Sequence, residues 1–352
     1  MAGRGEKIIK ELNKVYDHAR ERLKGICRVC RVCDGRSCIS GVPGMGGRGY
    51  SRQGFRRNRA ALDQFLLNLR TIHNTVSPDT TYNFFGVELS LPVMVAPMCE
   101  TTYNFLGQVD DYDFIAAQVE GAEASGTIAF TGDSPDPPLF EMGLKAIREI
   151  AGGKGVPIIK PRDTTEIVRR IKQAEESGVI AVGIDIDAAG FENFNRANQF
   201  VGPLSASKLR YITKSTRLPL ILKGIMTADE AVRAVECGAA GLVVSNHGGR
   251  TLDSTPGTAE VLPEIVSAVK GSIRLLIDGG FRSGEDILKA LALGAEAVLI
   301  GRPVAIAAVG GEKEGVSLLI QQFHAELTRS MLLTGCDGLS LIEPHVVRRT
   351  VF

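Results

Sequence analysis

Eight short apolar segments, each followed later in the chain by a segment with helical spacing, constrain the fold more than any other feature. Their length and their content of Val, Ile and Leu are typical of parallel strands that are buried on both faces. The predicted strands are Leu91–Pro97, Thr127–Gly132, Pro157–Pro161, Ala181–Asp187, Leu218–Gly224, Gly241–His247, Arg274–Gly280 and Ala297–Pro303. The predicted helices are Asp111–Ser125, Leu139–Ala151, Thr164–Ser177, Ser205–Ser215, Thr227–Cys237, Ala259–Val269, Gly284–Leu293 and Gly315–Leu333. Eight near-equal units predict an α/β fold of the (β/α)8 TIM-barrel type, in preference to its rival, an open doubly wound sheet.

The chain before the repeat predicts an N-terminal extension, residues 1–80, and the barrel domain is expected over residues 81–352. Residues 1–26 and 52–75 carry apolar side chains at helical spacing, so we predict a helix in each. The stretch Tyr82–Leu91 predicts a short hairpin that turns at Gly86. Residues 41–50 match the pattern G-x-G-x-x-G, but no apolar strand precedes them, so we interpret them as a loop and not as a dinucleotide-binding motif.

The composition argues against several classes of partner. The 352 residues include 41 basic and 40 acidic side chains, and a net charge of +1 offers no field of one sign to nucleic acid or to an anionic membrane. No apolar run is long enough to cross a bilayer, and the charged N-terminus lacks the apolar core of a signal peptide. We therefore expect a cytoplasmic protein that acts on a small molecule, without a membrane span or a nucleic-acid partner. We also expect a homo-oligomer.

Four cysteines in the extension, Cys27, Cys30, Cys33 and Cys38, follow the spacing C-x2-C-x2-C-x4-C. In a cytoplasmic chain such a cluster favours metal ligands or thiols over disulfides. The spacing is close to that of a [4Fe–4S] site, although its last gap is one residue longer and no Pro follows. Zinc is the second interpretation, although the usual division into two separated pairs is absent. Thiols without a metal are the third, and the sequence leaves all three open.

The segment from Val243 to Arg250 carries the strongest chemical signal. A β-branched run leads into His247, two glycines and Arg250. Histidine is the side chain best suited to move a proton near neutral pH, and arginine can grip a carboxylate with two parallel hydrogen bonds. A core histidine followed by a turn is the alternative. The position of the whole group at the C-terminal end of a strand favours a functional role.

Charged or glycine-rich residues end almost every predicted strand. The strand ends, in chain order, are Pro97-Met98-Cys99, Thr131-Gly132, Lys160, Asp185-Ile186-Asp187, Lys223-Gly224, His247, Asp278-Gly279-Gly280-Phe281-Arg282 and Gly301-Arg302. In a closed barrel these residues meet at one mouth, where barrel enzymes keep their active sites. The glycines after the last two strands, together with Arg282 and Arg302, predict a binding site for a phosphorylated ligand.

These motifs resemble the FMN-dependent α-hydroxy-acid dehydrogenase/oxidase family. The resemblance is strongest in five segments and can be followed more weakly from Arg59 to Asp187. The five segments are Leu218–Gly224, Ser245–Arg250, Asp278–Asp286, Leu291–Ala295 and Ile300–Pro303. The resemblance implies an enzyme with FMN in the barrel that oxidises a 2-hydroxy acid.

The resemblance also implies a role for each site residue. His247 would be the base that removes hydrogen from the α-carbon or the hydroxyl, and Asp187 would orient it and raise its basicity. Arg250 would bind the substrate carboxylate, and Lys223 would stabilise the anionic reduced flavin. The phosphate of FMN would lie at Gly280, Arg282, Gly301 and Arg302. The complete set of implied FMN contacts is Pro97, Met98, Thr131, Lys160, Lys223, Ser245, His247, Gly248, Asp278, Gly280, Arg282, Gly301 and Arg302.

The chain departs from the family pattern beside the substrate. Lys160-Pro161-Arg162 stands where the family has a substrate-binding tyrosine, and the second family arginine is displaced, with Arg196 a candidate to replace it. If the cysteine loop holds a cluster near the flavin, electrons leave through it, which predicts a dehydrogenase with an unidentified acceptor and not an oxidase. A flavin isomerase resembling type 2 isopentenyl-diphosphate isomerase is the alternative enzyme. A cysteine-rich docking module on a weakly catalytic barrel is the non-enzymatic alternative.

Overall fold

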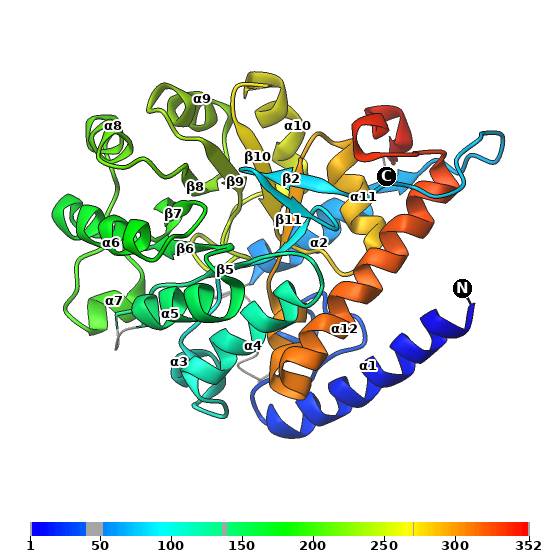
Figure 1. Cartoon of the computed structure of the whole chain (residues 1–352), viewed down its shortest axis with the longest axis horizontal. Helices are drawn as coiled ribbons and strands as arrows, with labels where there is room; N and C mark the ends of the chain where they lie inside the picture. The colour runs from blue at the N-terminus through cyan, green and yellow to red at the C-terminus, as the bar shows by residue number, and fades with distance from the viewer. Residues whose placement is uncertain (1, 40–51, 136–138, 270, 351–352) are drawn as a thin grey trace.

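The computed structural model describes residues 2–39, 52–135, 139–269 and 271–350. Its centre is a closed barrel of eight parallel strands, which confirms the barrel prediction and excludes the open sheet (Figure 1). The strands are β4 (Val93–Val95), β5 (Ala129–Thr131), β6 (Gly155–Ile159), β7 (Val182–Asp185), β8 (Leu220–Ile225), β9 (Gly241–Val244), β10 (Arg274–Asp278) and β11 (Ala297–Ile300). The barrel closes where β11 pairs with β4, with Val298 opposite Val93.

All eight predicted helices are present around the barrel. They are α4 (Asp111–Glu123), α5 (Leu139–Ala151), α6 (Thr164–Glu176), α8 (Ala206–Lys214), α9 (Ala228–Glu236), α10 (Thr258–Val269), α11 (Gly284–Ala292) and α12 (Arg302–Thr334). The last helix begins earlier than predicted, at Arg302, because Pro303 suits the first turn of a helix and not the end of a strand. It bends at Gly311 and Glu312, whose dihedral angles are not helical, so the predicted start at Gly315 marks only its second part.

A hairpin fills the N-terminal end of the barrel. It consists of β2 (Tyr82–Phe84) and β3 (Val87–Leu89), and it turns at Phe85 and Gly86, both with positive φ, as the sequence predicts. Its side chains Tyr82, Phe84 and Leu89 are buried in one cluster with the inward-facing residues of the barrel strands. Because this end is packed with apolar side chains, the open end of the barrel is the one where the strands finish.

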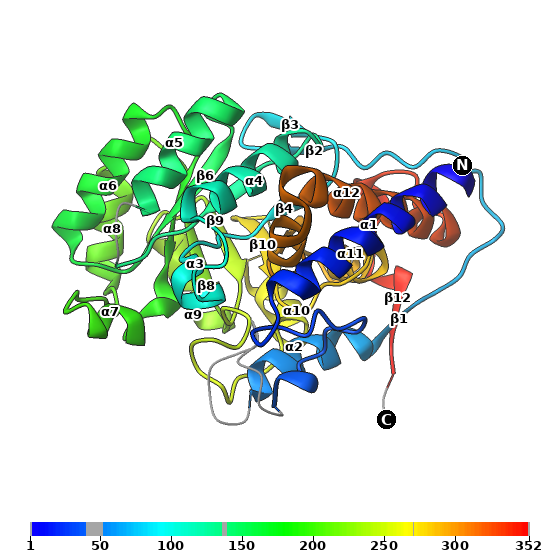
Figure 2. The same cartoon turned by 90° about the horizontal axis from the view of Figure 1, so that it is seen from below.

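The N-terminal helix α1 (Ala2–Arg22) lies along α12 (Figure 2). The two helices approach so closely at Gly310 that an added Cβ would lie 2.1 Å from the carbonyl oxygen of Val15. The next helix, α2 (Gln53–Asp63), corrects the prediction of a helix over 52–75. It ends at Asp63 because the following residues form β1 (Phe65–Leu67), which pairs antiparallel with β12 (Val347–Arg349) at the far end of the chain. A local pattern cannot show that partner.

Two short helices, α3 (Thr101–Phe105) and α7 (Glu192–Arg196), follow β4 and β7 at the mouth of the barrel. The described 3₁₀ turns are Ser37–Ile39, Ile186–Ala188, Leu339–Leu341 and Pro344–Val346. Within the described ranges, every helix is too short or too polar to span a lipid bilayer. The glycine-rich stretch 41–50 lies outside the described residues.

Candidate active site

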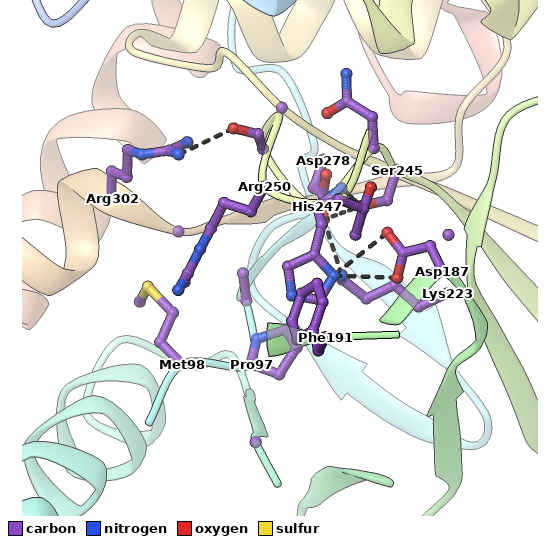
Figure 3. Close-up of a pocket in the computed structure, with 18 of the residues that line it drawn as sticks. Pro97, Met98, Asp187, Phe191, Lys223, Ser245, His247, Arg250, Asp278 and Arg302 are labelled. Carbon is purple, nitrogen blue, oxygen red and sulfur yellow. Dashed lines mark hydrogen bonds and ion pairs between the residues drawn. The ribbon is translucent and has the colours of Figure 1, made fainter. Parts of the chain in front are cut away.

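A cavity of about 1240 Å³ opens at the C-terminal ends of the barrel strands. It brings together nearly all of the site residues predicted from the sequence. Those that line it are Pro97, Met98, Lys160, Asp187, Lys223, Ser245, His247, Gly248, Arg250, Asp278, Gly280, Arg282, Gly301 and Arg302. Figure 3 shows that His247 and Arg250 point into the same space, with Pro97 and Met98 below them.

Thr131 is the exception among the predicted flavin contacts. It is buried at the end of β5, but its hydroxyl lies against α5, where an added Cβ on Gly143 would be 2.6 Å away. Successive side chains of a strand point to opposite sides, so Thr131 faces the surrounding helices, while Gly132 and Asp133 line the cavity. Thr131 therefore does not line the cavity, and its contact with the flavin ring stays a prediction.

His247 is held in one orientation by its backbone and by Asp187. Its φ of 55° is unusual for a residue with a side chain, and its backbone N–H donates to Ser245 Oγ at 3.0 Å. Nδ1 of the ring lies 3.0 Å from Asp187 Oδ1, and the ring of Phe191 packs edge-on at 4.9 Å between centroids. A carboxylate at Nδ1 favours the tautomer with the proton on that nitrogen, which leaves the lone pair of Nε2 available as a base.

The pKa of His247 is lowered to about 4, mainly by burial and then by the positive charge of Lys223. Asp187 acts in the opposite direction and raises the pKa, as the sequence analysis expected, but burial and the lysines outweigh it. The imidazole is neutral at pH 7, which is the form that accepts a proton.

Lys223 lies deep in the cavity between two carboxylates. Its Nζ is 2.9 Å from Asp185 Oδ1 and 3.7 Å from Asp278 Oδ2. Although burial opposes the charge, the two carboxylates hold the pKa of Lys223 above its usual range. Asp278 also accepts a hydrogen bond from Ser245 Oγ at 2.9 Å. The ammonium therefore stays charged and fixed, next to the space that a ligand would fill.

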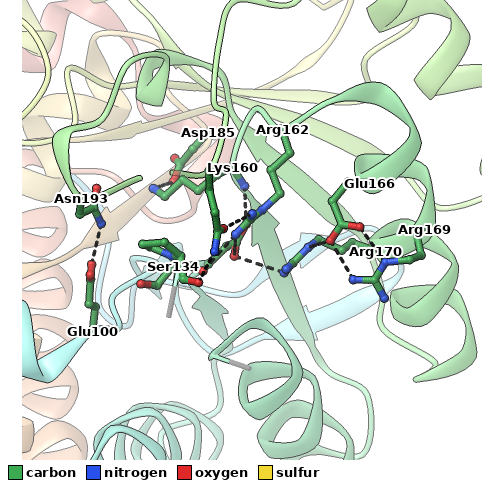
Figure 4. Close-up of polar contacts among 12 residues, drawn as sticks. Glu100, Ser134, Lys160, Arg162, Glu166, Arg169, Arg170, Asp185 and Asn193 are labelled. Atoms are coloured by element: carbon green, nitrogen blue, oxygen red, sulfur yellow. Dashed lines mark hydrogen bonds and ion pairs between the residues drawn. The ribbon is translucent and has the colours of Figure 1, made fainter. Parts of the chain in front are cut away.

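A second buried cation, Lys160, pairs with the same Asp185 at 2.6 Å (Figure 4). Next to it, Arg162 forms a bidentate pair with Asp133, at 3.0 Å for each hydrogen bond. At the position of the family tyrosine the chain thus has one buried cation that lines the cavity and one arginine that is held in a structural ion pair. Arg196, the candidate for the displaced second arginine, does line the cavity.

Arg250 presents its guanidinium on the wall near His247. Its Nη2 donates to Asn104 Oδ1 at 2.8 Å, and burial lowers its pKa. Glu100 lies close enough to act on it electrostatically, and burial raises the pKa of Glu100. A bound carboxylate would offset the cost of burying the guanidinium. An arginine that is buried without a full counter-charge therefore favours the binding of an acid.

The opposite side of the cavity is built from glycine and arginine. Gly248 has a φ of 64°, and an added Cβ would lie 2.6 Å from Nη1 of Arg302. The other terminal nitrogen of Arg302, Nη2, donates to the Gly248 carbonyl at 2.9 Å. Arg302 also packs over the ring of Phe55 at 4.1 Å. Burial and the neighbouring Arg282 lower the pKa of Arg302 to about 9. Two partly buried cations close to one another fit an anion such as a phosphate.

The site therefore fits FMN by its own chemistry. Glycines with open backbone and two arginines suit the phosphate, and a buried ammonium suits the negative charge of a reduced flavin ring. The cavity volume exceeds what a small substrate needs alone. Zinc or magnesium fits less well at Asp185, Asp187 and His247, although their ligand atoms lie within 4.8 Å of one another, because two lysines already neutralise Asp185.

Several residues of the site were not predicted from the sequence. Asp185 ends the same predicted strand as Asp187, and nothing in the sequence distinguishes the two carboxylates. Glu100, Asn104 and Phe191 come from the short helices or their edges, where no spacing singles them out. Asn58 of α2 exchanges hydrogen bonds with Asn246 at 2.7 and 3.0 Å and so fixes the base of the His247 loop.

The four predicted metal ligands, Cys27, Cys30, Cys33 and Cys38, are separate from this cavity. They line a small cavity of their own, of about 20 Å³, in the segment that follows α1. Burial raises the pKa of Cys27 and of Cys38.

Comparisons with known proteins agree with this site. The family model described as FMN-dependent dehydrogenase matches residues 45–203 and 192–349. An L-lactate oxidase of Nostoc sp. is 32% identical over 82% of this chain and 88% of its own, and a 4-hydroxymandelate oxidase of Amycolatopsis orientalis is 31% identical over 80% and 86%. A solved mandelate oxidase superposes with a TM-score of 0.76 at 29% identity, over 97% of this chain and 98% of its own. None of these supports the isomerase alternative. The chain belongs to the family of FMN-dependent α-hydroxy-acid dehydrogenases and oxidases.

Proposed function

We propose that His247, Asp187, Arg250 and Lys223 carry the FMN-dependent oxidation of a 2-hydroxy acid to the 2-oxo acid. The observation that carries this assignment is the pair of His247 Nδ1 and Asp187 Oδ1 at 3.0 Å, in the same cavity as Arg250 and Lys223. A base, a carboxylate clamp and a buried cation are the three functions that the reaction requires of the protein.

Arg250 binds the carboxylate of the substrate through two parallel hydrogen bonds and so directs the α-carbon towards the flavin space. Its contact with Asn104 limits the rotation of the guanidinium. The carboxylate is thereby bound in one plane, which places the hydroxyl within reach of the base.

His247 accepts a proton from the substrate, from the α-carbon or from the hydroxyl, on Nε2. The imidazolium that forms is stabilised by Asp187 at 3.0 Å and is shielded from water by Phe191. FMN supplies the acceptor for the two electrons. Lys223, fixed by Asp185 and Asp278, stabilises the negative charge that the reduction creates.

The test is anaerobic mixing of the FMN-loaded protein with lactate, glycolate and mandelate, followed by the loss of flavin absorbance. Removal of the base in His247→Asn is expected to slow bleaching by about 10²–10⁴-fold. The flavin spectrum and flavin content should not change. Bleaching at the wild-type rate in that variant would refute the assignment of the base.

We also propose that the enzyme is a dehydrogenase and that Cys27, Cys30, Cys33 and Cys38 hold a metal centre. Support comes from their shared cavity and from the position of their segment beside Arg282. Metal analysis, together with a comparison of oxygen consumption and dye reduction under the same conditions, tests both statements. Consumption of oxygen as fast as any dye is reduced would identify an oxidase.

The proposal includes a homo-oligomeric state. Support comes from large apolar side chains that are exposed in β1 and in the segment from β1 to β2: Leu66, Leu69, Ile72 and Val76. Light scattering on the purified protein measures the mass of the assembly, and a monomer would refute this part.

A further inference from the structure

The segment from Cys27 to Cys38 encloses a small cavity, and all four cysteines line it. Each of the four side chains is partly buried, and none forms a disulfide. The buried Val29 packs the segment against the main core, but this packing gives no reason for four sulfurs to surround one cavity. In a thiol-rich segment of this size a bound metal centre supplies that reason.

This cavity lies next to the side of the larger cavity that Arg282 and Arg302 line. Arg282 donates through Nε to the Cys33 carbonyl at 3.1 Å, and its Nη2 lies 3.5 Å from Cys33 Sγ. Arg52 donates to the Cys38 carbonyl. On the same side, Gly35 lies against the ring of Phe55, where an added Cβ would be 2.2 Å away, and Arg302 and Arg282 also lie over that ring. One arginine and one aromatic ring thus connect the cysteine segment to the flavin site.

The spacing of the sulfurs favours a cluster over a single ion. No three of these four described thiols have sulfurs that all lie within 4.8 Å of one another. A tetrahedral zinc ion with bonds of about 2.3 Å would hold its sulfurs about 3.8 Å apart. A cubane cluster binds one thiolate at each of four irons and therefore separates the sulfurs more widely. The first three cysteines also follow the C-x2-C-x2-C spacing of such sites.

The charges around the cavity fit a thiolate cluster. A cluster with four thiolates is an anion, and Arg28 lines the cavity while Arg282 contacts Cys33 Sγ. Hydrogen bonds to the sulfurs raise the reduction potential of a cluster, which makes it easier to reduce. The donor to Cys33 is Arg282, which also lines the larger cavity.

We propose that Cys27, Cys30, Cys33 and Cys38 bind one [4Fe–4S] cluster that receives the electrons of the reduced flavin. This inference rests on the proposed function, because the substrate supplies the electrons. Each 2-hydroxy acid loses two electrons and two protons. The cluster takes up the electrons one at a time and passes them to two molecules of a one-electron acceptor protein, and both protons go to water.

The first experiment measures the metal without substrate. The full chain is purified anaerobically, and iron, zinc, acid-labile sulfide and FMN are determined per chain. The electron paramagnetic resonance spectrum is recorded after reduction by dithionite. Iron and sulfide in equal amounts, at the stoichiometry of one cubane, together with a signal of a reduced cluster are expected. Zinc in place of iron, or a chain without either metal, would overturn the proposal.

The variant Cys30→Ser removes one ligand without touching the contacts that Arg282 makes with Cys33. We expect it to lose the cluster but to keep FMN. The matched control is Cys237→Ser, because the buried Cys237 Sγ donates to the Ala206 carbonyl and a hydroxyl can do the same. That control should keep both cofactors. Retention of full iron and sulfide in Cys30→Ser would contradict the ligand set.

The second experiment follows the electrons with cytochrome c as the one-electron acceptor. Cys30→Ser should bleach its flavin with substrate at the rate of the control but lose cytochrome c reduction. Undiminished cytochrome c reduction would overturn the role of the cluster. If no 2-hydroxy acid bleaches the flavin, the proposed function fails. The flavin is then reduced by light with EDTA, so the transfer step is still tested on its own.

Discussion

The most informative single change at the site is Asp187→Asn, which keeps the size of the side chain and removes its charge. The carboxylate lies 3.0 Å from His247 Nδ1 in a site that is largely closed to water. With an effective dielectric constant of about 20, a unit charge at this distance stabilises the imidazolium by about 5 kcal/mol. That energy corresponds to a loss of roughly 10³–10⁴-fold in the rate of flavin reduction if the proton reaches His247 in the transition state.

The assay is stopped-flow reduction of the flavin by substrate, measured without oxygen over a range of pH. In the wild type the pKa of His247 is about 4, so the rate of flavin reduction should be constant near neutral pH and fall as the pH drops through 4. In Asp187→Asn the favourable charge is lost, the pKa of His247 falls further, and the decline moves to lower pH. Asp229→Asn, an exposed carboxylate at the start of α9, is the control with the same chemical change. A rate within threefold of the wild type in Asp187→Asn would refute the reasoning. Tenfold in rate corresponds to about 1.4 kcal/mol, so a threefold change is far smaller than the stabilisation expected from the carboxylate.

Three further changes test other parts of the structure. Arg250→Lys replaces a bidentate clamp by a point charge, so KM for the substrate should rise about tenfold or more while FMN content stays constant in the same preparation. Gly248→Ala places a Cβ 2.6 Å from Arg302 at a φ of 64°, which should weaken FMN binding, measured by fluorescence titration, by about 1–3 kcal/mol. Gly310→Ala forces α1 away from α12, so limited proteolysis should cut α1 faster and the melting temperature should fall. Cleavage at the wild-type rate would mean that the packing of the two helices does not depend on this close approach.

The barrel could be predicted from the sequence because each of its strands is buried on both faces. A run such as Ala297–Ile300 is apolar and buried throughout, and the helices follow the strands at similar intervals along the chain. The elements that were predicted wrongly are those whose structure depends on residues far away in the sequence. Residues 65–67 form a strand only because Val347–Arg349 lies beside them, and nothing local distinguishes them from the end of a helix.

The site was predictable where chemistry coincides with a strand end, and less so elsewhere. His247, Lys223 and Asp278 follow directly from strand position. Thr131 ends a strand but faces α5, because one residue of register decides whether a side chain faces the cavity or the helices. The pKa of His247 could not be derived from its neighbours in sequence, since its largest cause is burial, which is a property of the whole fold.

The buried charges at the mouth form an alternating series, and Asp185 is its centre. Lys160 and Lys223, from β6 and β8, both pair with this carboxylate, which is only 2% exposed. Asp185→Asn should therefore leave two buried ammonium groups without their common counter-charge and lower the free energy of unfolding by about 3–5 kcal/mol, measured by urea denaturation of the FMN-loaded protein. Asp17→Asn, which breaks the exposed pair with Arg20 on α1, should change it by no more than about 1 kcal/mol. The double variant Asp185→Asn with Lys160→Met removes one of the two cations and should recover part of the loss. If the double variant is no more stable than Asp185→Asn alone, repulsion between the lysines is not what the carboxylate offsets.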